Sequence, residues 1–540
     1  MNLLLRRKNE PSRRQFLMQS GCTAMGVTSM VNTIAQLKMV QSALAQSSGS
    51  GYKALVCVFL QGGNDSNNLL VPISGAARTD YETGRGTLAL PAANLQPLSA
   101  NNLTECDPLG GGYLGTMGLH PQCPALATMF NNSELAMIAN VGTLTQPNVT
   151  RANFSTASKP PQLFSHSDQQ TQWQSSVPDR PFTSGWGGRA ADLLDSIYNP
   201  TSGNTSMNIS ISGVNSFQVS PTGTVTPYVM NSSGVVSLSG YGTNYASALT
   251  NPSAPIFTDS NYKTVEQGRR LRAFEQIVQM SQDSLMEDAY NTVVKSARVT
   301  EGKVGAALTA AATSGVNFDT TFTNAFAGSG VADSQDFPKQ MKLVAKLIAG
   351  NTALGNTRQI FFVQQGGFDT HTTQVPLSGG QPVLNQGQTA LLNTLNCSFK
   401  AFSDCLKSLG LWNNVVTFTA SDFTRTFTAN KTDASAGSDH AWGGHAIVMG
   451  GAVNGKRIYG KFPYLKLGVT ANASDPNLMD CTGSSGRWIP STSVDQYSAV
   501  LSKWLGVTDA QLPGVFPNLG RFNSPFSSTT ANLNFMNLLG

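Results

Sequence analysis

Histidine and aspartate residues gather in one stretch of this chain. The 540-residue sequence has 5 histidines, and two of them, His440 and His445, lie close together just after Asp439. Asp422 and Arg425 precede this group in the same stretch. Imidazole nitrogens and carboxylate oxygens are ligands of Zn²⁺ and of related divalent ions. The stretch therefore predicts a metal or catalytic site, and the alternative is a loop that exposes two histidines to solvent.

Three apolar runs, each typical of a buried strand, position carboxylates at their carboxyl ends. They are Ala54–Leu60 before Asp65, Gln359–Val363 before Asp369 and His371, and Val415–Phe418 before Asp422. Ligands of open α/β sheets bind outside the carboxyl ends of the strands, where glycines let the backbone bend sharply. We predict that the three runs are adjacent parallel strands and that their carboxylates meet in one crevice. With the nearby loop residues, the site has enough ligands for two divalent ions: Asp65, Asp369, His371, Asp422, Asp439, His440 and His445.

Helices alternate with these strands in the second half of the chain. Apolar residues at helical spacing predict helices over Phe337–Ala349 and Thr389–Leu409, ended by Gly350 and Gly410. Each helix precedes one of the apolar runs, and this order favours parallel strands joined by right-handed crossovers. The fold class is therefore α/β.

Ser165 and His166 stand at the start of another predicted helix. Ser165 lies three residues before Asp168, a spacing typical of a helix N-terminus. Backbone N–H groups at such a terminus attract anions. Ser165 is therefore either a nucleophile beside the metals or an ordinary helix cap, and Thr150 and Ser155 are alternative hydroxyl groups on the same connection.

Five sequence blocks together resemble a known family. They are GGND (Gly62–Asp65), GGFDTH (Gly366–His371), SDFTRT (Ser421–Thr426) followed by Asp439-His440, the pair Ser165-His166, and WGGR (Trp186–Arg189). The chain resembles the secreted domain-of-unknown-function 1501 family over roughly residues 50–510. That family is regarded as a relative of the alkaline phosphatase superfamily of phosphatases, sulfatases and phosphoglycerate mutases. The chain departs from the family pattern at Asp422, where Glu is usual, and at Thr424, where Gly is usual.

The resemblance implies an alkaline-phosphatase-like three-layer sandwich over residues 46–540, with a mainly parallel central sheet. An insertion or cap is expected over residues 201–335: alternating polar and apolar residues predict short strands over residues 201–260, which make it β-rich, and apolar residues at helical spacing predict a long helix over Lys263–Ala297. The implied function is an exported metal-dependent hydrolase of phosphate or sulfate esters. Ser165 would be the nucleophile, His166 a site residue and Arg425 a clamp on the anionic ester. Two divalent ions are expected, with Zn or Mn first and Ca or Mg as alternatives.

Two further considerations bear on that function. No cysteine stands in the Cys-x-Pro-x-Arg motif of type I sulfatases, so a formylglycine sulfatase is not expected. The alternative to an enzyme is a non-catalytic secreted binding or envelope-assembly protein on the same fold. Bound metal together with ester turnover would distinguish the enzyme from this alternative.

The N-terminus predicts export. Arg13 and Arg14 precede a weakly apolar stretch and the A-x-A site Ala43–Ala45, a layout similar to a twin-arginine signal peptide over residues 1–45. The expected partner is the twin-arginine export machinery, and the expected location is periplasmic or extracellular. The later sequence has no uninterrupted apolar run of about 20 residues, so no stable membrane span is expected. The net charge is +5, and the sequence has no run of basic residues, which argues against nucleic-acid binding.

Six cysteines follow the predicted signal peptide. In an oxidising compartment they can form disulfides. Cys106 and Cys123 flank a glycine-rich loop and are the expected pair, whereas Cys397 and Cys405 are too far apart along one helix to pair with each other.

Overall fold

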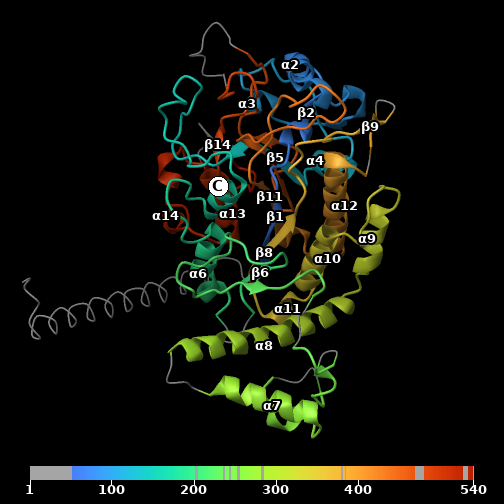
Figure 1. Ribbon diagram of the computed structural model, residues 1–540, viewed down its shortest axis with the longest axis vertical. Helices are drawn as coiled ribbons and strands as arrows, with labels where there is room; N and C mark the ends of the chain where they lie inside the picture. The colour runs from blue at the N-terminus through green and yellow to red at the C-terminus, as the bar shows by residue number, and fades with distance from the viewer. Residues whose placement is uncertain are drawn as a thin grey trace, which may run out of the picture.

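The computed structural model describes residues 51–540 except 201–204, 235–237, 243–244, 252–255, 281–284, 379–380, 384, 469–478, 527–532 and 539–540. Its centre is a mainly parallel sheet with the strand order β13-β5-β12-β11-β1-β8-β6-β7, and β14 adds beside β5 (Figure 1). The strands are β1 (Lys53–Leu60), β5 (Leu135–Gly142), β6 (Asn208–Ser210), β7 (Tyr228–Val229), β8 (Arg358–Gln365), β11 (Val415–Ser421), β12 (Gly444–Met449), β13 (Ile458–Tyr459) and β14 (Thr492–Ser493). The predicted α/β class and the mainly parallel sheet are confirmed.

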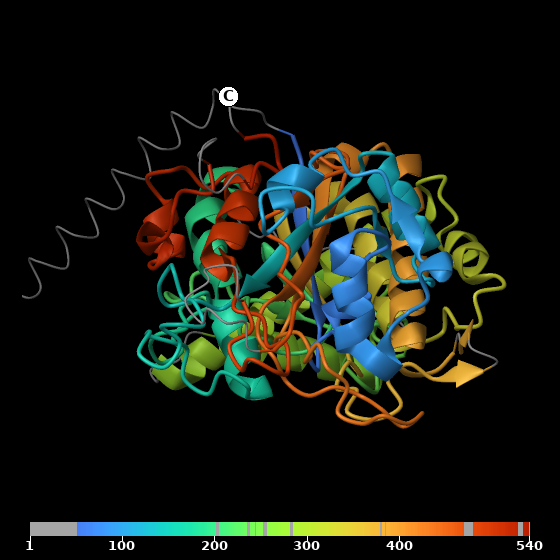
Figure 2. The same cartoon turned by 90° about the horizontal axis from the view of Figure 1, so that it is seen from above.

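Helices cover both faces of this sheet, so the central strands are buried on both sides. One face carries α4 (Pro124–Asn131), α10 (Asp336–Ala349) and α12 (Gly387–Ser408), and the other carries α6 (Trp186–Tyr198), α13 (Val494–Leu505) and α14 (Leu512–Val515). Figure 2 shows the strands between these two groups of helices. Along β1, Val56 and Val58 pack into the first core, and Leu55 and Phe59 pack into the second. Burial on both faces explains why β1 is a continuous apolar run.

The segment from 201 to 335 is mainly helical in its described residues, and the expected β-rich part, residues 201–260, holds two short strands, β6 and β7. It contains α7 (Glu266–Gln279), α8 (Leu285–Ala312) and α9 (Phe318–Phe326), and α7 with part of α8 projects from the rest of the molecule in Figure 1. Its strands β6 and β7 are short and extend the central sheet beside β8. Helix α8 continues beyond the helix expected over Lys263–Ala297 into an alanine-rich stretch that ends at Ala312, because alanine favours helix more than any other residue.

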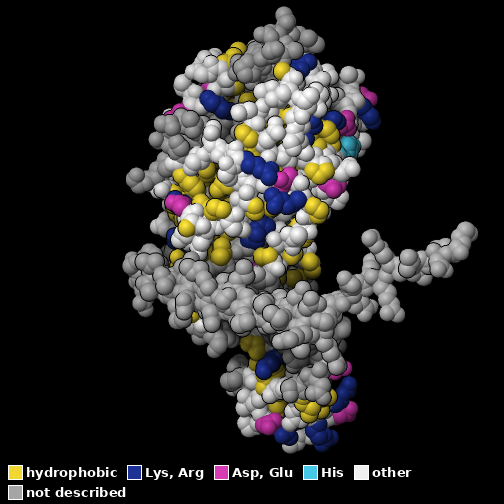
Figure 3. Space-filling model, turned by 90° about the vertical axis from the view of Figure 1, so that its left-hand side faces the viewer, with side chains coloured by type: hydrophobic (Ala, Val, Ile, Leu, Met, Phe, Trp, Pro, Cys, Tyr) yellow, Lys and Arg dark blue, Asp and Glu magenta, His cyan; other side chains and the backbone are white. Residues whose placement is uncertain are grey.

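The projecting arm, defined as α7, α8 and residues 241–262, carries a buried charge network. Arg298 on α8 donates to Glu275 on α7 at 2.6 Å and to Glu301 at 2.5 Å. The hydroxyl of Tyr245 donates to Glu301 at 2.9 Å. These paired charges connect the helices to the preceding segment. Figure 3 shows charged side chains beside hydrophobic ones on this end of the molecule.

Shorter elements complete the fold. A small antiparallel sheet joins β2 (Leu70–Pro72), β4 (Met117–Leu119) and β3 (Gln96–Leu98), next to α2 (Ala76–Arg85) and α3 (Leu103–Cys106). The elements α11 (Asn351–Leu354), β9 (Leu377–Ser378) and β10 (Gln381–Pro382) flank β8 in the chain. The expected disulfide between Cys106 and Cys123 is not formed, and both thiols are free. Their sulfur atoms face different partners, because Cys106 lies against the Leu103 carbonyl and Cys123 against the Leu392 carbonyl.

The predicted signal peptide over residues 1–45 lies outside the described residues. Within the part of the chain that the structure does describe, no helix has the length and apolar character needed to cross a membrane.

Candidate metal centre

The candidate site lies where three neighbouring parallel strands end. β1 pairs with β11 through Leu60 and Ser421, and with β8 through Leu60 and Gln365, so all three carboxyl ends are level. The predicted adjacency of the three strands is confirmed. The turn after β1 passes close to the turn after β8, because a Cβ atom on Gly62 would lie 2.5 Å from the backbone nitrogen of Asp369. Gly62 also has a φ of +109°, so only glycine fits this turn without strain.

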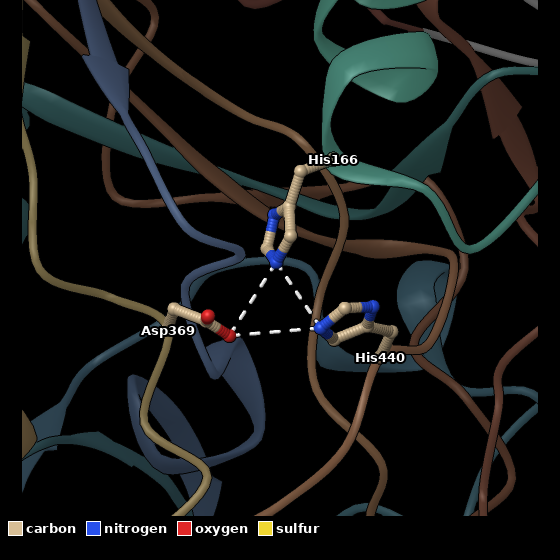
Figure 4. A group of neighbouring side chains, drawn as sticks. All are labelled: His166, Asp369 and His440. Carbon is tan, nitrogen blue, oxygen red and sulfur yellow. Dashed lines mark hydrogen bonds and ion pairs between the residues drawn. The ribbon is translucent and has the colours of Figure 1, made fainter.

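Four side-chain donor atoms face one another above these strand ends. Nε2 of His440 lies 3.1 Å from Nε2 of His166 and 3.0 Å from Nε2 of His371. Oδ1 of Asp369 lies 3.4 Å from the His166 nitrogen, 3.1 Å from the His371 nitrogen and 3.6 Å from the His440 nitrogen. Figure 4 shows three of these side chains pointing toward a common centre. The four donors come from three segments that are far apart in the chain.

The opposite ring nitrogen of each histidine is held by an oxygen acceptor. Nδ1 of His166 donates to Oδ2 of Asp422 at 2.6 Å, and Nδ1 of His371 donates to Oδ1 of Asp439 at 3.0 Å. Nδ1 of His440 donates to the carbonyl oxygen of Phe164 at 2.8 Å. A carbonyl or an ionised carboxylate only accepts hydrogen bonds, so each Nδ1 carries the proton. In the neutral ring this leaves a lone pair on Nε2, which is the state that binds a metal.

The donor atoms lie close enough to share one ion. Zn–N bonds of 2.0–2.1 Å in a tetrahedron place neighbouring nitrogens roughly 3.3 Å apart. Nε2 of His166, Nε2 of His440 and Oδ1 of Asp369 lie 3.1 to 3.6 Å from one another. Nε2 of His371 lies 3.0 Å from the His440 nitrogen and 3.1 Å from Oδ1 of Asp369. The side chains of Asp369 and His371 are 49% and 42% exposed, so the centre is open to solvent on one side. Three imidazoles and a carboxylate are a donor set suited to zinc and similar transition metals.

Arg425 contacts the site from the protein interior and does not face the solvent. Its side chain is fully buried, and it donates to the carbonyl oxygens of Gly62, Gly63 and Ser438 and to Asp369. Its Nη1 also lies 3.3 Å from Nε2 of His371. Burial raises the pKa of Asp369, but the hydrogen bond and the charge of Arg425 outweigh it and hold that pKa below its usual value. Arg425 thereby keeps Asp369 ionised and ties the turn after β1 to the turn after β8.

The histidines differ in their electrostatic surroundings. The hydrogen bond to Asp422 is the main cause of a raised pKa at His166. Burial lowers the pKa of His440, and the positive charge of Arg425 adds to this effect. The ring of Phe423 lies 4.8 Å from the rings of both His166 and His440 and packs against the two.

His166 reaches the centre because it is the first residue of α5 (His166–Ser175). Ser165, the preceding residue, does not cap the helix through its side chain. Its hydroxyl instead donates to Oδ2 of Asp168 at 2.6 Å. Ser165 therefore stands between Phe164, which holds His440, and His166. Gln170, one turn further along α5, donates to Asp422 at 3.0 Å.

Two residues of the predicted ligand set lie elsewhere. Asp65 is buried in an ion pair with Arg85 and accepts hydrogen bonds from Gln374 and Asn67, so its oxygens are occupied. His445 is buried in β12, where it accepts from the backbone of Asn140 at 3.1 Å and stacks on Phe462. Burial lowers the pKa of His445 to about 3. Both residues hold the surrounding fold together.

Sequence reasoning placed the remaining predicted residues in one site but assigned some of them different parts. It treated His166 as a catalytic residue, whereas its Nε2 converges with the donor atoms of Asp369 and His440. It treated Asp422 and Asp439 as ligands, whereas each accepts from the Nδ1 of a histidine. Phe423, Gln170 and the Phe164 carbonyl were not predicted. Phe423 had a signal, since it stands inside the SDFTRT block between Asp422 and Arg425.

Comparison with known proteins places the chain in a family. No curated protein matches it. Residues 52–482 match the family described as "Protein of unknown function (DUF1501)". The matched span contains every residue of the candidate metal centre, from the turn after β1 to His440. The chain belongs to the DUF1501 family.

Proposed function

We propose that this protein is a metal-dependent hydrolase whose single divalent ion is held by His166, His440 and Asp369, with His371 beside them. One observation carries the proposal: Nε2 of His166, Nε2 of His440 and Oδ1 of Asp369 lie 3.1 to 3.6 Å from one another, while the Nδ1 of each of these histidines is occupied. A divalent cation between them would bind both lone pairs and the carboxylate, and Arg425 adds its own positive charge beside Asp369 and His371. Zinc is the first candidate, since this donor set and spacing suit it, and manganese is the second.

Ser165 is the proposed nucleophile. Its Oγ–H donates to Asp168 at 2.6 Å, and a carboxylate in this position can accept the proton as the oxygen attacks. Its neighbours Phe164 and His166 both take part in the centre, and the hydroxyl is proposed to reach the substrate from the position between them. The ion would stabilise negative charge on the attacked group. Ser165 starts α5, whose free N–H groups favour an anionic substrate there.

The proposed substrates are phosphate or sulfate esters. The support is the resemblance of the sequence blocks to the alkaline phosphatase superfamily, together with a mainly parallel sheet covered by helices on both faces. An alkaline-phosphatase-like sandwich and export as a folded, metal-loaded protein through the twin-arginine machinery belong to the same proposal. The buried position of Arg425 leaves the binding of the anionic group to α5 and to the ion rather than to this guanidinium.

Elemental analysis of the natively purified protein, combined with a panel of phosphate and sulfate esters, tests the proposal. We expect about one equivalent of zinc or manganese per chain and ester turnover. His440→Ala and Asp369→Ala should lose the metal, because each removes a donor. His445→Gln is the matched control, because it removes a histidine outside the centre and should keep the metal. Absence of metal from the unaltered protein would refute the site.

Ser165→Ala separates the nucleophile from an ordinary helix start. We expect this variant to lose turnover and to keep its metal and its fold, because loss of a hydroxyl at a helix terminus costs only about 1 kcal/mol. Ser167→Ala, a neighbouring hydroxyl in the first turn of α5, is the control and should retain most of the activity. Full activity in Ser165→Ala would transfer the role to another group. Bound metal without turnover on any ester would favour the non-catalytic binding protein.

A further inference from the structure

A second candidate binding site lies outside the metal centre, in a groove beside α10. The groove is bounded by α10, by the end of α8, by the start of α9 and by residues 232–234, on the right-hand side of Figure 1. Its volume is about 610 Å³. Small-molecule sites in proteins have volumes of roughly 300–1,000 Å³. The groove is therefore large enough for a small organic ligand.

One wall of the groove is positively charged. Lys339, Lys342 and Lys346 line it, and their spacing places all three on one face of α10. Asp319 is the one acidic residue among the described residues that line the groove. It lies 2.8 Å from Lys342 and 3.5 Å from Lys346, whereas Lys339 has no ion pair with the described residues. Three lysines against one aspartate leave the lining with a surplus of positive charge.

The lining is also partly apolar. Leu308 from α8, Val316 and Phe318 contribute to it, and Leu343 lies on α10 next to Lys342. The side chains of Lys342 and Lys346 are only 20% and 30% exposed, so these two charges are partly sheltered from water. Sheltered charges interact more strongly with a ligand than fully hydrated ones do. The N-terminus of α9, with Asn317 as its cap, adds partial positive charge at one end of the groove.

We propose that this groove binds a small amphiphilic organic anion. Its carboxylate or similar oxyanion group would lie against Lys339 and Lys346, and its aliphatic or aromatic body would lie against Leu308, Val316 and Leu343. The unpaired Lys339 offers the first ion pair, and Lys346 offers the second in exchange for its longer contact with Asp319. The proposal does not depend on the metal centre, because the two sites share no residue.

Calorimetric titration of the purified chain with octanoate, acetate and octylammonium tests this groove. We expect octanoate to bind more tightly than acetate, which lacks the apolar body, and octylammonium to fail, because its charge has the wrong sign. The double variant Lys339→Gln/Lys346→Gln should weaken octanoate binding about tenfold, because each substitution removes one partly screened charge contact. The pair between Lys342 and Asp319 remains in this variant, so the fold should be retained.

Lys263→Gln/Lys400→Gln is the matched control, because it removes two lysines outside the groove. Octanoate binding should be unchanged in this control and in the metal-free protein. Ala312→Trp, which fills part of the groove, should also abolish binding if the ligand occupies it. Equal affinity for octanoate and octylammonium, no octanoate binding at millimolar concentration, or equal loss in the control variant would each overturn the proposal. Octanoate binding is also measured on the metal-free protein, so the test of the groove does not depend on the test of the hydrolase.

Discussion

Each histidine of the metal centre uses one ring nitrogen to hold its position and presents the other. Asp422 has the most central supporting part, since it accepts from His166, from Gln170 and from the backbone N–H of Gly62 at 2.6, 3.0 and 3.3 Å. Its side chain is buried and does not contact solvent. Asp422 therefore fixes both the rotamer and the tautomer of His166 without being a donor itself.

This arrangement predicts the effect of changing Asp422. Asp422→Asn keeps the shape but weakens the acceptor for His166, so zinc affinity should fall about 10- to 100-fold while the donors remain. Asp65→Asn is the control, because Asp65 is also buried near the end of β1 but contacts Arg85; it should lower thermal stability more than metal affinity. Competition with a chromophoric chelator measures the affinity. An unchanged affinity in Asp422→Asn would show that His166 needs no such support.

At the residue scale, the sequence identified which side chains lie together but not which of them converge on the centre and which accept hydrogen bonds from a histidine. Asp369, His371, Asp422, Asp439 and His440 were predicted together, because glycine-rich turns and clustered histidines are local signals. Whether an oxygen faces an ion or an imidazole depends on side-chain rotamers, which no local pattern records. Asp422 and Asp369 follow similar strands, yet one supports His166 and the other converges with three Nε2 atoms.

At the element scale, apolar periodicity with glycine stops predicted the main helices well. The helix expected over Phe337–Ala349 is α10 at Asp336–Ala349, and the helix expected over Thr389–Leu409 is α12 at Gly387–Ser408. The segment that precedes α10 was harder. A long helix was expected over Lys263–Ala297, but α7 and α8 divide that stretch. The arm packs mainly on itself and on α10 and α11, so its apolar pattern is weaker than that of a core helix.

Helix α13 gives a prediction of its own, because its first turn buries an acid. Burial raises the pKa of Asp495 to about 7, well above the value of about 3.9 in an unfolded chain. Between these two values the folded state binds more protons than the unfolded state, so this residue lowers stability as pH rises from about 4 to 7. Asp495→Asn should therefore be relatively more stable near pH 7 than near pH 4, by a few kcal/mol at most.

Urea unfolding of both proteins at several pH values measures this difference. Asp509→Asn, an exposed acid that pairs with Lys503 after the same helix, is the control and should leave the pH profile unchanged. A parallel pH profile for Asp495→Asn and the unaltered protein would mean that Asp495 is ionised in the fold without penalty.

At the scale of the whole molecule, the metal centre joins segments that only the fold brings together. His166 comes from the start of α5, Asp369 and His371 from the turn after β8, and His440 from the loop before β12. The parallel order β11-β1-β8 is predictable from helix–strand alternation, and it explains why the turns meet. The position of α5 over those turns could not be predicted in this way. The strand before α5 is β5, which lies beyond β12 in the sheet, and a long connection leads from β5 to α5.

A centre assembled from distant segments should couple metal binding to global stability. An ion that binds only the folded chain adds about 2.7 kcal/mol of stability at a concentration one hundred times its Kd. For a chain of this size we expect excess zinc to raise the Tm of the chelator-treated protein by a few degrees. Differential scanning calorimetry with and without zinc measures the shift. His440→Ala should show no shift, His445→Gln should show the full shift, and an equal response of both variants would place the zinc at some other part of the molecule.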